Sequence, residues 1–271
     1  MKSFINFLNS LDFSLRSEQV MARDFDKGLA AVEAGDFETA LAEWLPLAKA
    51  GNADAQFGIG AIYHDGTGVP KDYAQAEKWW RLAAKQGLPC AQINLGILCY
   101  SRGTVTQDYS EAAKWYGMAA EQGNSIAQNA LGVMYRRGDG VAQSDAEAAK
   151  WYRLAAEQGL REAQFNLGLM YECGDGVVQS NGEALKWYHV AATQGHAKAA
   201  HRIGAAFQNG WSVLQNYRKA HMWYNIGSAN GSLAAKHSRD AIAAEMTPED
   251  ISTAHAMAKK CMSSGYKDYG W

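Results

Sequence analysis

The sequence predicts an all-α protein, a right-handed solenoid built from tandem helix-turn-helix repeats. Offsetting the chain against itself by 36 residues brings identical residues into register. The composition is also unusual, with 27 Gly, 9 Trp and 13 Tyr against only 4 Pro. Residues that recur at a fixed period of this length are typical of repeat architectures.

Six columns hold one residue type in all five copies of the period. They recur every 36 residues and begin at Ala55, Gly60, Val69, Ala76, Trp79 and Gly87. Because every copy shares these positions, we expect them to serve packing, with the tryptophan column, including Trp151, in the core. Glycine inside a helix costs about 1 kcal/mol relative to alanine, so the Gly60 column predicts close approach of a neighbouring helix.

Two segments precede the five copies. Residues 1–23 are expected to form an amphipathic helix, because apolar residues recur there at helical spacing. A signal peptide cleaved after Ala22 is the alternative, although polar residues interrupt the apolar run that it needs. Residues 24–52 fit the second half of the register through Asp36, Ala40, Trp44 and Ala48. Their first half is too short for the full loop, as expected of a degenerate terminal repeat.

Each copy within residues 53–232 is expected to hold two helices, the first over about 54–64 and the second from Asp72. Helix starts are indicated by the pairs Asp108 with Glu111, Ser144 with Glu147, and Ser180 with Glu183. Gly87 then lies where a helix commonly ends in a left-handed residue. Residues 233–271 form a predicted helical cap and aromatic tail, with a helix start at Thr247-Pro248.

The columns match the motif A-x-A-Q-x-x-L-G-x-x-Y-x-x-G-x-G-V, followed by D-x-x-x-A-x-x-W-Y-x-x-A-A-x-x-G. Residues 127–135 and 163–171 carry it well. Over about residues 25–232 the chain therefore resembles the Sel-1-like repeat family of bacterial type, relatives of the tetratricopeptide repeat. Copy two departs at Cys99, and copy five departs at Phe207 and Ser212. The resemblance implies an adaptor in complex assembly, signalling or host interaction.

Motifs for other functions are missing from the sequence. There is no phosphate-binding or nucleophile-elbow motif, and the spacing of His189, His196 and His201 matches no zinc signature. We therefore expect no catalytic residues, no metal and no cofactor. A net charge of −2 gives no reason to expect nucleic-acid binding, and no apolar run reaches the roughly 18 residues of a membrane span.

The columns that vary between copies predict a binding face on the first helices, which line the concave side of tetratricopeptide-like stacks. This face has an apolar floor with amide and arginine groups along one wall, suited to an extended chain. The candidate residues are Asn94, Ile97, Ser101, Val133, Arg137, Asn166, Leu169, Arg202 and Asn209. The alternative is that these side chains face solvent and bind nothing.

The predicted function is a non-enzymatic scaffold that binds a protein or peptide. A secreted effector or host-interaction factor using the same surface is one alternative, and a hydrolase or cell-wall-active enzyme is another. The four cysteines are predicted to be free thiols, which favours a reducing, cytoplasmic location over a periplasmic or secreted one. The sequence does not determine the oligomeric state.

Overall fold

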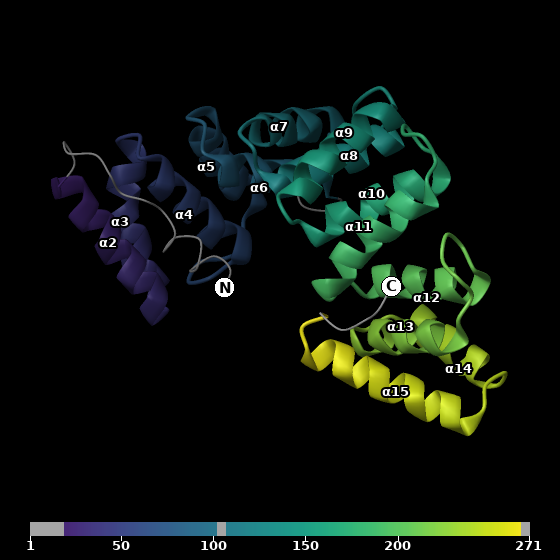
Figure 1. Cartoon of the computed structure of the whole chain (residues 1–271). Coiled ribbons are helices and arrows are strands. Elements are labelled where there is room, and N and C mark those ends of the chain that lie inside the picture. The colour runs from purple at the N-terminus through teal and green to yellow at the C-terminus, as the bar shows by residue number, and fades with distance from the viewer. Residues whose placement is uncertain (1–18, 102–106, 267–271) are drawn as a thin grey trace. The chain divides into compact units, whose positions relative to one another are not determined.

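The computed structural model describes residues 19–101 and 107–266, with side chains from Phe25 onward (Figure 1). The predicted helix at residues 1–23 therefore falls largely outside the described part of the chain. In the described part every regular element is an α-helix. The helices are α2 (Gln19–Ala34), α3 (Phe37–Lys49), α4 (Ala53–Asp65), α5 (Tyr73–Lys85), α6 (Pro89–Tyr100), α7 (Tyr109–Glu121), α8 (Ser125–Arg137), α9 (Asp145–Glu157), α10 (Arg161–Cys173), α11 (Asn181–Thr193), α12 (Ala197–Asn209), α13 (Tyr217–Ala229), α14 (Leu233–Ala243) and α15 (Pro248–Ser263).

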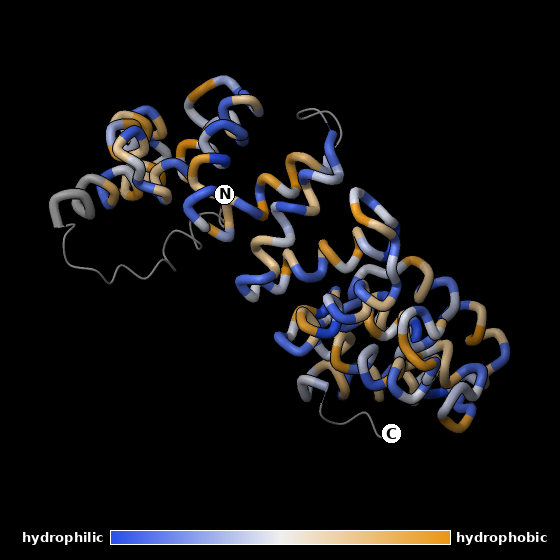
Figure 2. Tube along the Cα trace, turned by 90° about the horizontal axis from the view of Figure 1, so that it is seen from above, coloured by the Kyte–Doolittle hydropathy of each residue, from blue (hydrophilic) through white to orange (hydrophobic). Residues whose placement is uncertain are grey.

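Successive helices form tandem pairs in a solenoid-like repeat fold, as predicted. The chain divides into two compact units, residues 1–127 with 139–141 and residues 128–138 with 142–271. Within each unit a helix packs against the helices before and after it in the chain, as α4 does against α3 and α5. Hydrophobic and hydrophilic residues alternate within most helical turns (Figure 2), and most helices bury one side, whereas α4 is buried all round from Ala55 to Ile62.

The glycine column of the first helix is explained by an aromatic ring of the second helix. A Cβ built on Gly132 would lie 2.7 Å from Cδ1 of Tyr152, closer than carbon atoms pack without a shift. The same contact recurs in every copy between the glycine and the residue that follows the constant tryptophan. These aromatic residues are Trp80, Tyr116, Tyr152, Tyr188 and Tyr224. The glycine thus admits a ring where any side chain would exclude it.

The tryptophan column is less uniformly buried than predicted. Trp79, Trp115 and Trp223 are buried, but Trp151 and Trp187 are only half-buried. Tyr152, the residue beside Trp151, is 2% exposed. The deeper position belongs to the neighbouring column because its ring enters the space left by the glycine.

The degenerate N-terminal copy is a complete helix pair, α2 with α3. Gly28 contacts the Trp44 ring, and Trp44 Nε1 donates to the Phe25 carbonyl at 3.0 Å. In the next copy Trp80 Nε1 donates to the Phe57 carbonyl at 3.1 Å. The two arrangements match when the first helix is offset by 32 residues instead of 36, so the link between α2 and α3 is four residues shorter. α2 begins at Gln19, before the expected start of this copy.

The predicted helix starts are confirmed by their hydrogen bonds. The side chains of Asp108, Ser144 and Ser180 each accept from the backbone N–H three residues on, at 2.9, 3.2 and 3.3 Å. Thr247 caps α15 in the same way through Asp250 N at 3.2 Å. In copy five Ser212 replaces a glycine but keeps its left-handed backbone, with φ of 57°.

A ladder of buried glutamines links each first helix to the second helices beside it. Gln164 is 2% exposed; its Nε2 donates to the Ala156 carbonyl at 3.2 Å, and its Oε1 accepts from Gln194 Nε2 at 2.9 Å. Gln92 makes the equivalent bonds. In copy five Ala200 takes the glutamine position, and the Asn230 amide nitrogen at the partner position is buried without a hydrogen bond.

Helices α14 and α15 cover α13 at the end of the second unit. Ala254, Ala258 and Cys261 of α15 are buried, in line with the predicted apolar side of this helix. None of the four cysteines forms a disulfide, as predicted. No helix in the described ranges combines the length and the apolar character that crossing a bilayer requires.

Candidate functional site

The first helices of the second unit leave one side partly open. On α10 the constant side, including Ala163, Leu167 and Met170, is fully buried. Phe165 and Asn166 on the opposite side are half-buried. The variable columns therefore do reach the surface here.

A groove of about 430 Å³ lies on this open side, across α8, α10 and the start of α12. We call it the first-helix groove. It is lined by Asn129, Glu162, Phe165, Asn166, His196, Ala197 and Lys198. Two of its walls are well defined. Asn166 Nδ2 donates to Asn129 Oδ1 at 3.0 Å, and the Phe165 and His196 rings stack with centroids 4.5 Å apart.

His196 is held in place by the start of α12. Its Nδ1 accepts from Ala199 N at 3.2 Å, so the side chain caps the helix. A nitrogen that accepts this bond is unprotonated. Burial lowers the pKa of His196, with Glu162 opposing and Arg161 adding to the shift. The neutral ring therefore forms an uncharged aromatic wall.

The lining of the groove includes one acidic and one basic side chain, Glu162 and Lys198. Burial raises the pKa of Glu162, but the hydrogen bond from Arg161 and its positive charge outweigh burial and leave that pKa below its usual value. Arg161 Nε lies 2.9 Å from Glu162 Oε1. Lys198 is exposed on α12. The groove thus combines amides, an aromatic wall and one charge of each sign.

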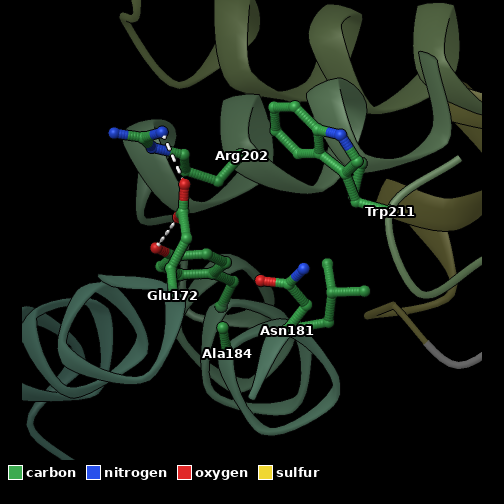
Figure 3. Close-up of a pocket in the computed structure, with 8 residues that line it drawn as sticks. Glu172, Asn181, Ala184, Arg202 and Trp211 are labelled. Carbon is green, nitrogen blue, oxygen red and sulfur yellow. Dashed lines mark hydrogen bonds and ion pairs between the residues drawn. The ribbon is translucent and has the colours of Figure 1, made fainter. Parts of the chain in front are cut away.

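A second, smaller cleft of about 20 Å³ lies between the C-terminal half of α10, α11, α12 and the loop after α12 (Figure 3). Trp211 stands across it from Asn181 and Ala184. At its edge Arg202 Nη1 contacts Glu172 Oε1 at 2.9 Å, and Tyr188 Oη donates to the other oxygen of Glu172. We call this the Trp211 cleft.

The predicted binding residues fall into several environments. Asn166 lines the first-helix groove, and Arg202 lines the Trp211 cleft. Val133 and Leu169 are half-buried and pack against the core, so they contribute more to packing than to a contact surface. Arg137 is exposed.

The remaining predicted residues lie outside both cavities. Asn209 Nδ2 bonds to the Ala205 carbonyl of its own helix at 2.9 Å. In the first unit Asn94 is half-buried, Ile97 is 47% exposed, and Ser101 ends α6. In copy one the equivalent positions, Gly58 and Ala61, are buried, so the predicted binding face does not extend to this copy.

Comparison with known proteins identifies the repeat. The Sel1 repeat model matches residues 53–88, 91–124, 125–160, 161–196 and 197–232. The chain belongs to the Sel1 repeat family. No curated protein gave a significant match.

Two crystal structures of Sel1 repeat proteins are similar along most of the chain. One is the protective antigen c5321 of uropathogenic Escherichia coli, at 30% identity and a TM-score of 0.77. The match covers 94% of this chain but only 58% of the antigen. The other is a Sel1 repeat protein from Oxalobacter formigenes, also at 30% identity and 0.77, covering 87% of this chain and 99% of that one.

Most residues that line the groove between these Sel1 repeats were not predicted from the sequence. Asn129 and Phe165 occupy the column just before Asn166 in the repeat, a column that also varies. They could have been found by comparing columns offset by one residue between neighbouring copies, that is, residues 37 positions apart instead of 36. Asn129 and Asn166 are 37 residues apart and meet across neighbouring first helices, as do His201 and Ser238 at 3.0 Å. No group of three or more potential metal ligands occurs among the described residues.

Proposed function

We propose that this Sel1 repeat chain is a non-enzymatic scaffold that binds an extended peptide segment of a partner protein in the first-helix groove. The observation that carries the proposal is the Asn129–Asn166 amide pair beside the Phe165–His196 stack. The protein family and the solenoid-like fold support it, since stacked repeats use extended surfaces for protein binding.

The amide pair has hydrogen-bonding capacity left over. A primary amide has two N–H donors and an oxygen with two lone pairs. The single bond between the two side chains leaves Asn129 with both donors, and Asn166 with one donor and its oxygen. A peptide main chain offers matching N–H and C=O groups in alternation. The neighbouring aromatic wall would pack against an apolar or flat side chain.

Different observations bear on the two alternative functions and on the cellular location. A hydrolase would need a nucleophile, a base or a metal, and the sequence contains no motif for these. A host-interaction factor outside the cell is favoured by the similarity to a protective antigen. Four cysteines without a disulfide favour the cytoplasm. Sequencing the N-terminus of the native protein decides between the compartments, because cleavage after Ala22 would contradict the cytoplasmic location.

The binding proposal is tested with a phage-displayed library of random dodecapeptides selected on the purified protein. We expect enriched peptides whose Kd rises about tenfold with Asn166→Ala, the loss of about one hydrogen bond. Asn94→Ala is the matched control, because Asn94 occupies the same column on α6 outside the groove. The helical signal and melting temperature should stay unchanged in both variants. A library that yields no binding peptide, or peptides indifferent to Asn166→Ala, would contradict the proposal.

A further inference from the structure

The first-helix groove and the Trp211 cleft are joined by shared side chains. The Phe165 ring of the groove lies against the Tyr188 ring, with centroids 5.6 Å apart. Tyr188 Oη in turn bonds to Glu172 at the edge of the cleft. Asn166 and Glu172 are six residues apart on α10, which is about 9 Å along the helix axis and about a third of a turn around it. An extended peptide needs at least about three residues to cover the distance between them.

Trp211 occupies a position that has a structural role in earlier copies. Asp139 accepts from Tyr100 Oη at 2.7 Å, and Asp175 pairs with Arg136 at 3.2 Å. Tyr100, Arg136 and Glu172 share one column, as do Asp139, Asp175 and Trp211. Glu172 of copy four binds Arg202 and Tyr188 instead. In copy five the equivalent loop position therefore carries no carboxylate for this contact, and its indole is 46% exposed.

The loop is held in a conformation that its sequence does not favour. Ser212 follows Trp211 and has φ of 57°, a left-handed backbone that favours glycine. Such conformations persist where the surrounding structure holds them, and they gather at functional sites. Leu214, two residues further on, is 91% exposed. A half-exposed indole and an exposed leucine on this loop would gain apolar burial from a bound partner.

The lining of the cleft defines the chemistry of its occupant. Ala184, Leu185 and Ala206 line the cleft together with the indole, and Ala184 lies across it from Trp211 (Figure 3). The Glu172 carboxylate is already paired, so the cleft does not call for a cation. The cleft is small, about 20 Å³, and its lining is mostly apolar, which suits an aliphatic side chain.

We propose that the Trp211 cleft is a side-chain pocket for one aliphatic residue of the peptide that the first-helix groove holds, at least about three residues along from the segment beside Asn166. This inference rests on the proposed function and specifies its ligand. The peptide passes from the first-helix groove to the Trp211 cleft along α10 and α12. The amides of the groove hold its main chain, and its aliphatic anchor lies between Trp211 and Leu185.

The test uses the same random dodecapeptide library. Peptides enriched on the full chain are expected to carry Leu, Ile, Val or Met at one fixed position. Trp211→Asp, which installs the residue of the two preceding copies, should raise the Kd of a synthetic enriched peptide at least about tenfold. Replacing the peptide's anchor by alanine should weaken binding to the unmodified protein and change little in the variant. Trp211→Ala provides a second variant, and Ser212→Gly provides the control that keeps the indole.

The outcomes separate the two proposals. If enriched peptides depend on Asn166 but bind Trp211→Asp and Trp211→Ala with unchanged Kd, the groove stands and the pocket is wrong. If the library yields no binding peptide, both are wrong. Peptides with a fixed aromatic or cationic residue that depends on Trp211 would overturn the assignment of an aliphatic anchor.

Discussion

The Tyr152 ring of α9 lies on Gly132 of α8, where a Cβ would come within 2.7 Å of Cδ1. We predict that Gly132→Ala destabilises the protein by about 1–3 kcal/mol, the usual range for overpacking a core. This loss runs against helix propensity, which favours alanine by about 1 kcal/mol. Urea denaturation followed by circular dichroism measures the difference.

Gly117 of α7 is the matched control. It also lies inside a helix, but a Cβ there would meet nothing within 4 Å. Gly117→Ala should therefore stabilise the protein by about 0.5–1 kcal/mol. The same sign for both substitutions would show that the ring contact does not explain the glycine column.

The depth of the two aromatic columns leads to a second prediction. Tyr152 is 2% exposed, whereas Trp151 is half-buried. Tyr152→Ala should cost about 3–5 kcal/mol, as deletion of a buried large aromatic does. Trp151→Ala should cost less, although tryptophan is the larger residue. A larger loss of unfolding free energy for Trp151→Ala would contradict this order.

The glutamine ladder gives a third prediction. Gln164→Ala removes two hydrogen bonds, one to the Ala156 carbonyl, which still accepts from Gly159 N, and one from the exposed Gln194 amide. A hydrogen bond contributes about 0.5–1.5 kcal/mol, so we expect a loss of about 1–3 kcal/mol in chemical denaturation. Asn230→Ala is the comparison, because the Asn230 amide nitrogen already lacks a partner. It should be close to neutral, and equal losses would argue against a stabilising role for the ladder.

Two buried histidines predict a loss of stability in acid. Burial lowers the pKa of His189 from 6.5 to about 4. Burial, reinforced by His255 and Arg239 and opposed by Asp240, does the same for His221. Both residues stay neutral in the folded protein while the unfolded chain takes up protons. Stability is therefore complete above pH 6.5 and falls between pH 6.5 and 4, by up to about 3 kcal/mol per histidine.

The variant that checks this effect is His221→Gln. It should flatten the pH dependence of the melting temperature between pH 6.5 and 4, because one proton uptake on unfolding is lost. His237→Gln, a substitution of an exposed histidine on α14, should leave the slope unchanged. An unchanged slope in His221→Gln would exclude this histidine as the source.

The repeat, its period and its helix starts could be predicted from the sequence because each of the five copies needs the same residues for its caps, loops and packing. A cap, a loop glycine or an apolar stripe depends on residues within about one turn, and five copies repeat that signal. The same logic placed a degenerate repeat with a short loop at residues 24–52, but it did not find the contacts of Gly28 and Phe25 with Trp44, because four fewer residues in the link move them out of register.

Tertiary structure decided the positions that depend on neighbouring repeats. The sequence could not tell which of two adjacent aromatics is deeper, because depth depends on how far the ring of Tyr152 reaches over Gly132 of another helix. Nor could it join Asn129 to Asn166 or Trp211 to Ala184, since no column or helical face contains both members of either pair. Periodicity reports what every copy needs, whereas a binding site is made by the differences between copies and by the distances across which they meet.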